Sequence, residues 1–175
     1  MTLLLGAAAP EADAPLYLPD GKLAVPADYR EWVFLSAGYD MNYSAAPPMA
    51  EGHMFDNVFV NAVAWHEFQR TGHWPDKTVF VREDRGGSSK GSINKNGEFQ
   101  NDNLMGVEFH VHDEARFKGG WGFFFSTGTA PADFVPYEQD CYACHQSHGA
   151  VDTTFTQFYP TAKPFAVKAG TFRGE

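Results

Sequence analysis

The stretch that decides the fold is Leu104-Met105-Gly106-Val107-Glu108-Phe109-His110-Val111-His112, in which apolar and polar side chains alternate. Successive side chains of a β-strand point to opposite faces of the sheet. The apolar positions, which share one face, are Val107, Phe109 and Val111. The positions on the other face are Glu108, His110 and His112. The pattern predicts a strand with one buried face, and for the two histidines we expect a solvated polar face rather than a metal site.

Further strands are predicted on both sides of this stretch. Short apolar runs rich in β-branched and aromatic residues lie at 31–36, 57–61, 78–83 and 121–127. The segment from Gly86 to Gly97 is rich in Gly, Ser, Asn and Lys, which predicts a surface loop or hairpin connection. These segments predict a mainly β fold, built on an antiparallel sheet.

A short helix is predicted over residues 62–71. Asn61 can serve as its N-cap, Trp65 and Phe68 share one face, and Gly72 can end it. We therefore expect a few short helices beside the sheet.

Composition narrows the class of protein. The 175 residues suffice for one domain with a real core, and 43% are hydrophobic, among them 16 phenylalanines. A net charge of -9 argues against nucleic acid, and no run reaches the ~20 apolar residues of a membrane span. Residues 1–15 read as a signal remnant or a disordered lead, and 16–175 as a single domain.

The two cysteines lie together in Cys141-Tyr142-Ala143-Cys144-His145. A Cys-x-x-Cys-His run is the attachment signature of c-type haem. Thiols about one helical turn apart can form thioethers with the two vinyl groups on one porphyrin edge, and the adjacent histidine supplies an imidazole to the iron. We therefore predict Cys141 and Cys144 as covalent anchors, and His145 as the axial ligand, of one haem c.

Other interpretations of this pentapeptide are weaker. A thioredoxin-like dithiol would need a βαβ context, which the sequence around Cys141 lacks. A disulfide between Cys141 and Cys144 would close a very small loop and stabilise the fold little. A zinc site that adds His145 and His148 would crowd its ligands into one short segment.

The second axial position of the iron decides what such a haem does. Electron-transfer cytochromes close it with methionine or a second histidine. All five methionines lie upstream of the motif, and no local sequence signal identifies any of them as a ligand. We expect an open iron, or one capped by phenylalanine, with nitric oxide and carbon monoxide as natural ligands.

Beyond the haem motif, the chain resembles the cytochrome P-460 and cytochrome c′-β family of monohaem c-type cytochromes. The resemblance runs from about Asp20 to Pro160 and includes Trp65 and the haem motif. The other matching segments are Tyr29-Arg30-Glu31-Trp32-Val33, Val58-Phe59-Val60-Asn61, Arg70-Thr71-Gly72, Thr78-Val79-Phe80-Val81, Met105-Gly106-Val107-Glu108, Trp121-Gly122-Phe123-Phe124 and Phe155-Thr156-Gln157-Phe158-Tyr159-Pro160. The resemblance implies a predominantly antiparallel β fold, a homodimer and a periplasmic location.

One position separates the two branches of this family. Cytochromes P-460 cross-link a lysine to the porphyrin and oxidise hydroxylamine, and that position corresponds here to Arg82. A guanidinium stays protonated and is a poor nucleophile. Lys77, at an odd offset from Arg82, would point to the opposite face of a strand. The resemblance is therefore closer to cytochrome c′-β, whose pentacoordinate haem binds nitric oxide behind a hydrophobic cap.

The resemblance also suggests roles for further residues. Arg82 is expected in the distal pocket or at a propionate, and Asp56 stands where an arginine is expected. Glu138, with Asp140, is a candidate second-sphere proton acceptor or a cap of the helix that carries the haem motif. The candidates for the distal cap, all on early strands, are Phe34, Phe55 and Phe59.

Three functions follow for the predicted haem-binding domain. The preferred one is a periplasmic protein that binds nitric oxide and similar gases for scavenging, transport or sensing. The first alternative is an oxidoreductase that acts on hydroxylamine or nitric oxide, or that works as a peroxidase. The second is an electron-transfer cytochrome, whose negative charge suits a basic redox partner.

Overall fold

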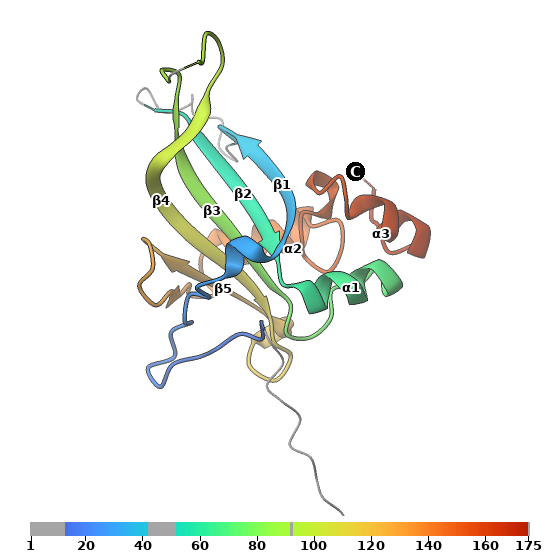
Figure 1. Cartoon of the computed structure of the whole chain (residues 1–175). Coiled ribbons are helices and arrows are strands. Elements are labelled where there is room, and N and C mark those ends of the chain that lie inside the picture. Colours follow the sequence, from blue (N-terminus) through green and yellow to red (C-terminus); the bar gives the residue numbers. More distant parts are fainter. Residues whose placement is uncertain (1–12, 42–51, 92, 175) are drawn as a thin grey trace, which may run out of the picture.

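The computed structural model describes residues 13–41, 52–91 and 93–174, so most of the predicted lead over 1–15 lies outside it. Within these residues, strands form one antiparallel sheet in which each pairs with the next along the chain (Figure 1). The strands are β1 (Val33–Tyr39), β2 (Met54–Val60), β3 (Val79–Ser88), β4 (Phe99–His112), β5 (Trp121–Ser126) and β6 (Asp133–Phe134). The predicted mainly β, antiparallel fold class is confirmed.

The helices are short. They are α1 (Ala62–Thr71), α2 (Asp140–His148) and α3 (Lys163–Ala169), with single 3-10 turns η1 (Tyr29–Glu31), η2 (Lys118–Gly120) and η3 (Thr156–Phe158). No helix among the described residues is long and apolar enough to cross a membrane.

Helix α1 has the predicted bounds, but its N-cap works differently. Asn61 makes no side-chain capping bond and instead joins the helix to the sheet. Its Oδ1 accepts from the backbone N–H of Val79 at 2.9 Å, and its Nδ2 donates to the carbonyl of Lys77 at 3.2 Å. Gly72 ends the helix in the left-handed conformation, with φ 73°.

Several strand boundaries differ from the predicted ones; β2 starts at Met54 rather than at residue 57, and β4 starts at Phe99 rather than at residue 104. The first strand starts at Val33 rather than at residue 31, because residues 29–31 form the turn η1. The predicted loop over 86–97 is shorter, because β3 continues to Ser88 and pairs there with the start of β4.

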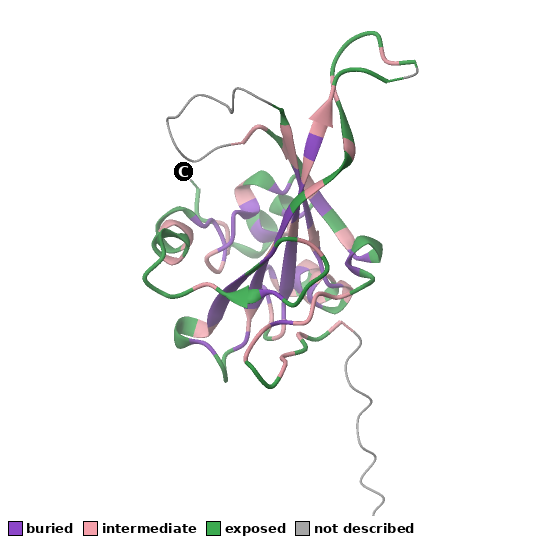
Figure 2. Ribbon diagram, turned by 90° about the vertical axis from the view of Figure 1, so that its left-hand side faces the viewer, coloured by how far each residue is buried: buried purple, intermediate pink, exposed green. Residues whose placement is uncertain are grey.

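The sheet separates two hydrophobic cores. One lies against α1, α3 and the C-terminal segment, and includes Phe68, Trp74 and Phe80. The other lies on the opposite face under the N-terminal segment, and includes Leu23 and Phe109. Buried residues follow the strands through the middle of the molecule, and exposed ones mark the hairpin tip and the outer sides of the helices (Figure 2).

Candidate functional site

The pairing of β2 to β5 sorts side chains into rows on the face that carries α1 and α3. The first row is Val60, Phe80, His110 and Phe123. The next row is Val58, Arg82, Glu108 and Phe125. The last row is Asp56, Asp84 and Gly106. This face therefore changes from aromatic to charged along the strands.

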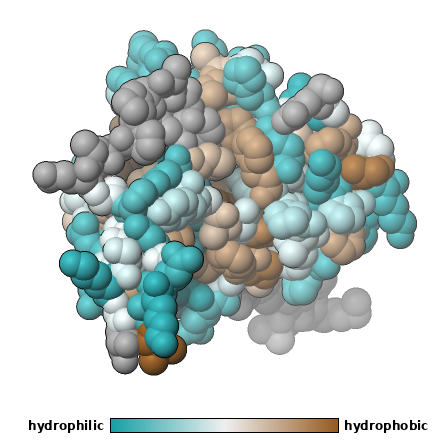
Figure 3. Space-filling view, turned by 90° about the horizontal axis from the view of Figure 1, so that it is seen from above, coloured by the Kyte–Doolittle hydropathy of each residue, from teal (hydrophilic) through white to brown (hydrophobic). Residues whose placement is uncertain are grey.

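A pocket of about 550 Å³ lies over these rows. Its other walls are the first half of α2 and the segment around η3, with residues 36–38 and Met41 of the β1 region at one side. Seen from above, apolar side chains gather in the middle of the molecule between hydrophilic ones (Figure 3). The aromatic side chains that line the pocket are Phe80, Phe123, Phe155, Phe158 and Tyr159.

Helix α2 presents the predicted haem motif to this pocket. Cys141, Cys144 and His145 all line it, because positions three and four residues apart share a helix face. The two cysteines are not joined by a disulfide. Tyr142, between them, anchors the helix: its hydroxyl donates to the Val135 carbonyl at 2.9 Å and accepts from the Phe123 N–H at 3.2 Å.

His145 is held in one tautomer. Its Nδ1–H donates to the carbonyl oxygen of Thr153 at 2.8 Å, which leaves the lone pair on Nε2. The pKa of His145 is lowered to about 4, mainly by burial; the Thr153 carbonyl opposes this effect, and the positive charge of Arg82 adds to it. The imidazole is therefore neutral near pH 7 and available as a metal ligand.

His110 lies in the pocket wall, so the expectation of a solvated histidine face is wrong for this residue. Its side chain is buried, and its ring stacks on Phe123 with centroids 4.1 Å apart. It also meets the ring of His145 edge to face, with centroids 4.7 Å apart at 72°. Helix α2 covers this face of β4. Strand periodicity shows which side chains share a face but not which element covers it.

The charged end of the pocket is built around Arg82. Its Nε and Nη2 donate to the two carboxylate oxygens of Asp84 at 2.9 and 3.0 Å, and its Nη1 donates to Glu108 at 3.2 Å. Arg82 is thus at the pocket, where the resemblance predicts it. Lys77 lies elsewhere, paired with Asp113 at 2.5 Å.

Two buried aspartates make this end acidic. The pKa of Asp84 is raised to about 6, mainly by burial; Arg82 opposes this effect, and the charges of Glu108 and Asp56 add to it. Asp56 is 4% exposed, and its Oδ1 has no hydrogen-bond partner among the described residues. A Cβ at position 38 would lie 2.1 Å from that oxygen, so any larger residue there would have to displace the Asp56 carboxylate. At this end of the pocket, Asp56 thus supplies a carboxylate where the resemblance leads one to expect an arginine.

The three phenylalanines predicted as the distal cap lie on the other face of the sheet. Phe59 packs against the core under the N-terminal segment, and Phe34, 50% exposed, contacts it with ring centroids 5.7 Å apart. Phe55 contacts Tyr39 at 4.9 Å. On β2 they alternate with Asp56 and Val58, which do line the pocket. A cap made by these three rings within one chain is therefore ruled out.

Glu138 does not join the site either. It is exposed, just before α2, and does not line the pocket. Neither it nor Asp140 caps the helix, because the N-cap residue is Gln139 and makes no side-chain capping bond. Asp140 lies in the first turn of α2, where it does line the pocket.

Sequence reasoning missed several residues that the structure brings to the site. Asp84 follows Arg82 by two residues, so strand periodicity alone could have placed both on one face. The aromatic wall of Phe80 and Phe123 needs the register of β3, β4 and β5. The Thr153 carbonyl had no sequence signal, because any residue supplies one.

These residues fit a covalently attached haem. A helix presents two thiols and a neutral imidazole to a pocket walled by flat aromatic rings. In the described part of the chain, a buried imidazole nitrogen of His110 in this wall has no hydrogen-bond partner. The fold and this site define a c-type haem protein built on an antiparallel sheet.

Comparison with protein families leads to the same class. Residues 26–156, most of the chain, match the family described as cytochrome P460. The chain belongs to the cytochrome P460 family, and its cofactor is haem c with its iron. No curated protein sequence matches it.

Proposed function

We propose that this protein is a haem c protein of the cytochrome c′-β type that binds nitric oxide and similar small neutral gases. Cys141 and Cys144 would hold the porphyrin, and His145 the iron. A haem iron with one protein ligand supplies an open coordination position to such gases. The protein would then scavenge, transport or sense nitric oxide.

The observation that carries the proposal is the arrangement of the two pocket imidazoles. His110 and His145 touch edge to face, so no flat ring fits between them. His110 therefore does not face His145 across a porphyrin, which argues against bis-histidine ligation. The aromatic walls around His145 favour small neutral ligands, because charged ones would lose hydration there.

Met41 tests this proposal, since it is the one methionine among the described residues that line the pocket. We expect the reduced protein to show a high-spin optical spectrum without a red-shifted Soret band, and to bind carbon monoxide and nitric oxide. Met41→Leu should leave the spectrum and both affinities unchanged. Optical titration of the two ferrous proteins measures this.

Two outcomes would contradict gas binding at an open iron. Low-spin α and β bands in the reduced wild-type protein that disappear in Met41→Leu would identify Met41 as a sixth ligand and favour electron transfer. A strongly red-shifted Soret band would indicate a porphyrin cross-link despite Arg82.

The acidic end of the pocket supports a second candidate, oxidation of hydroxylamine. Oxidation of hydroxylamine releases protons as well as electrons. In the assay, an added redox dye accepts the electrons. Asp84 is buried behind the pocket-lining Arg82, and its raised pKa makes it a suitable proton acceptor for a proton that leaves the pocket through that contact. Arg82, which holds both Asp84 oxygens, would fix the orientation of that carboxylate.

A pH profile tests this second candidate. Only the ionised carboxylate accepts a proton, so turnover should rise with pH through about 6, the pKa of Asp84. Asp84→Asn should lower turnover about 100-fold at pH 7, within the range of general-base effects, and remove that part of the rise. Protonation of hydroxylamine itself affects wild type and variant alike, so their difference isolates Asp84.

Glu138→Gln is the matched control, because Glu138 is a carboxylate outside the pocket. It should keep the wild-type profile. No turnover by the wild-type protein, or an Asp84→Asn profile equal to that of wild type, would remove this candidate.

Location and assembly follow from the chemistry and the family. Bacteria attach haem c outside the cytoplasm, which supports a periplasmic location, and the resemblance supports a homodimer. A basic redox partner suits the net charge of -9.

A further inference from the structure

The turn that holds the axial histidine is strained. Residues 151–154 form a tight turn closed by the Thr154 N–H, which donates to the Val151 carbonyl at 2.7 Å. Its two central residues, Asp152 and Thr153, have φ of 47° and 62°. Turns with positive φ at both positions favour Asn-Gly, and a β-branched residue there is an outlier. The local sequence alone therefore does not favour this turn.

The side-chain hydroxyl of Thr153 also lacks hydrogen bonds to the described part of the chain. Its Oγ1 is buried without a hydrogen-bond partner among the described residues. The one polar atom of this residue with a role at the site is its carbonyl oxygen, which accepts from Nδ1 of His145 at 2.8 Å. Strain of this kind persists only where surrounding contacts hold it.

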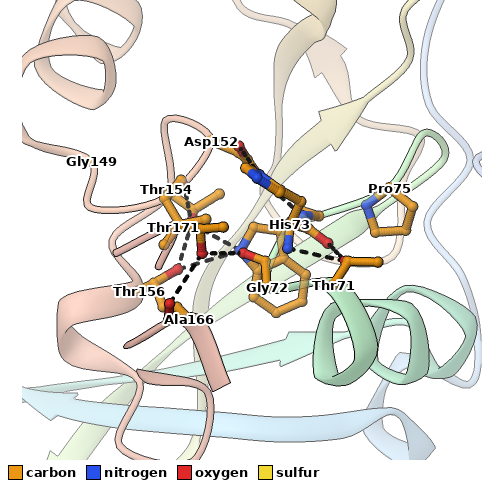
Figure 4. Close-up of polar contacts among 12 residues, drawn as sticks. Thr71, Gly72, His73, Pro75, Gly149, Asp152, Thr154, Thr156, Ala166 and Thr171 are labelled. Carbon is orange, nitrogen blue, oxygen red and sulfur yellow. Dashed lines mark hydrogen bonds and ion pairs between the residues drawn. The ribbon is translucent and has the colours of Figure 1, made fainter. Parts of the chain in front are cut away.

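Those contacts come from the connection between α1 and β3 (Figure 4). The Asp152 carboxylate accepts from the backbone N–H of Trp74 at 2.8 Å, and from Nδ1 of His73 at 2.9 Å. The Trp74 indole Nε1–H donates to the hydroxyls of Thr154 and Thr156 at 3.1 and 3.3 Å. One side of the turn is thus fixed to the buried Trp74.

The other side of the turn lies against the end of α2. A Cβ at Gly149 would be 2.6 Å from both the His145 carbonyl oxygen and the Thr153 carbonyl carbon. Glycine at this position therefore lets the turn approach the helix closely enough for the Thr153 carbonyl to reach the imidazole.

We propose that Asp152 is a positioning residue for the axial ligand: it fixes the 151–154 turn and so holds the Thr153 carbonyl against Nδ1 of His145. This hydrogen bond sets the tautomer and the direction of the ring and strengthens the imidazole as a donor to iron. Asp152 thereby contributes to the reduction potential from outside the pocket. The inference goes beyond the proposed function, because it concerns the bond between His145 and iron whatever ligand binds opposite.

The test compares Asp152→Ala with wild type as purified holo-proteins. Loss of the clamp should release the strained turn and weaken the hydrogen bond to Nδ1. The reduction potential should shift to a more positive value, because a weaker donor stabilises the ferric state less. The iron–histidine stretching band in resonance Raman spectra of the ferrous protein should shift to lower frequency.

Three further variants separate positioning from general damage. Asp152→Asn keeps an acceptor oxygen and a residue that tolerates positive φ, so it should resemble wild type. Gly149→Ala pushes the turn away from α2 and should shift both readouts in the same direction as Asp152→Ala. Adding Thr153→Gly to Asp152→Ala removes the strain and should restore the wild-type values.

Asp76→Ala is the matched control. Asp76 lies in the same connection, and its carboxylate accepts from the Glu114 N–H at 2.9 Å, with no bond to the turn. It should leave both readouts unchanged. An unshifted reduction potential in Asp152→Ala, or an equal shift in Asp76→Ala, would overturn the proposal. The reduction potential is measurable whether or not the sixth position is open, so this result is independent of gas binding.

Discussion

Replacing both Cys141 and Cys144 with alanine is expected to abolish covalent haem attachment completely. Each thiol can form one thioether, and these are the only two cysteines of the chain. Cys141 is exposed and Cys144 half-buried, so the substitutions should cost the polypeptide little packing. Haem staining after denaturing electrophoresis measures the loss, and the single variants should each keep one thioether.

Tyr142→Phe is the control for this experiment. It lies between the two cysteines and removes the hydroxyl that joins α2 to Val135 and Phe123, but it keeps both thiols. Covalent haem should be retained in this variant. Haem that stays attached in the double alanine variant would contradict the assignment and show that another side chain is bonded to the porphyrin.

Replacing Trp74 with alanine is expected to cost about 3–5 kcal/mol of unfolding free energy, as for other large aromatic residues in cores. Trp74 is 2% exposed, stacks on Phe68 with centroids 3.7 Å apart, and meets Phe80 edge to face at 4.7 Å. The substitution removes these contacts and leaves the hydroxyls of Thr154 and Thr156 without their indole donor. Urea unfolding of the holo-protein measures the change.

Trp74→Phe separates packing from hydrogen bonding. It keeps a stacked ring but removes the Nε1–H donor and part of the ring volume, so it should cost about 1–3 kcal/mol, less than Trp74→Ala. A loss below about 1 kcal/mol in Trp74→Ala would contradict the central place of this residue, because the packing lost from a buried aromatic ring costs more than that.

Local patterns of the sequence predicted most of the fold. The alternation around Phe109 indicated a strand with one buried face, and residues 62–71 form a helix with the predicted bounds. These predictions succeeded because side-chain period, capping and turn preferences act over a few neighbouring residues. Boundaries were less accurate where tertiary pairing extended an element, as at Ser88.

The candidate site was predictable only where its chemistry is local. The haem motif needs its cysteines and histidine within one helical turn, so the pentapeptide itself carried that prediction. The pocket walls come from separate strands, and neither the burial of His110 nor the exposure of Phe34 follows from periodicity. Arg82 lines the pocket, and its contact with Glu108 depends on the register of β3 with β4.

The sequence by itself thus determined the class of fold and the haem c motif, because each depends on residues close together in the chain. Only the tertiary structure decided which face of the sheet receives the haem motif, and that the pocket has an aromatic and an acidic end. It also decided that the carbonyl of Thr153 holds His145. The physical reason is that these features depend on which elements cover one another, and that is set by packing between distant segments.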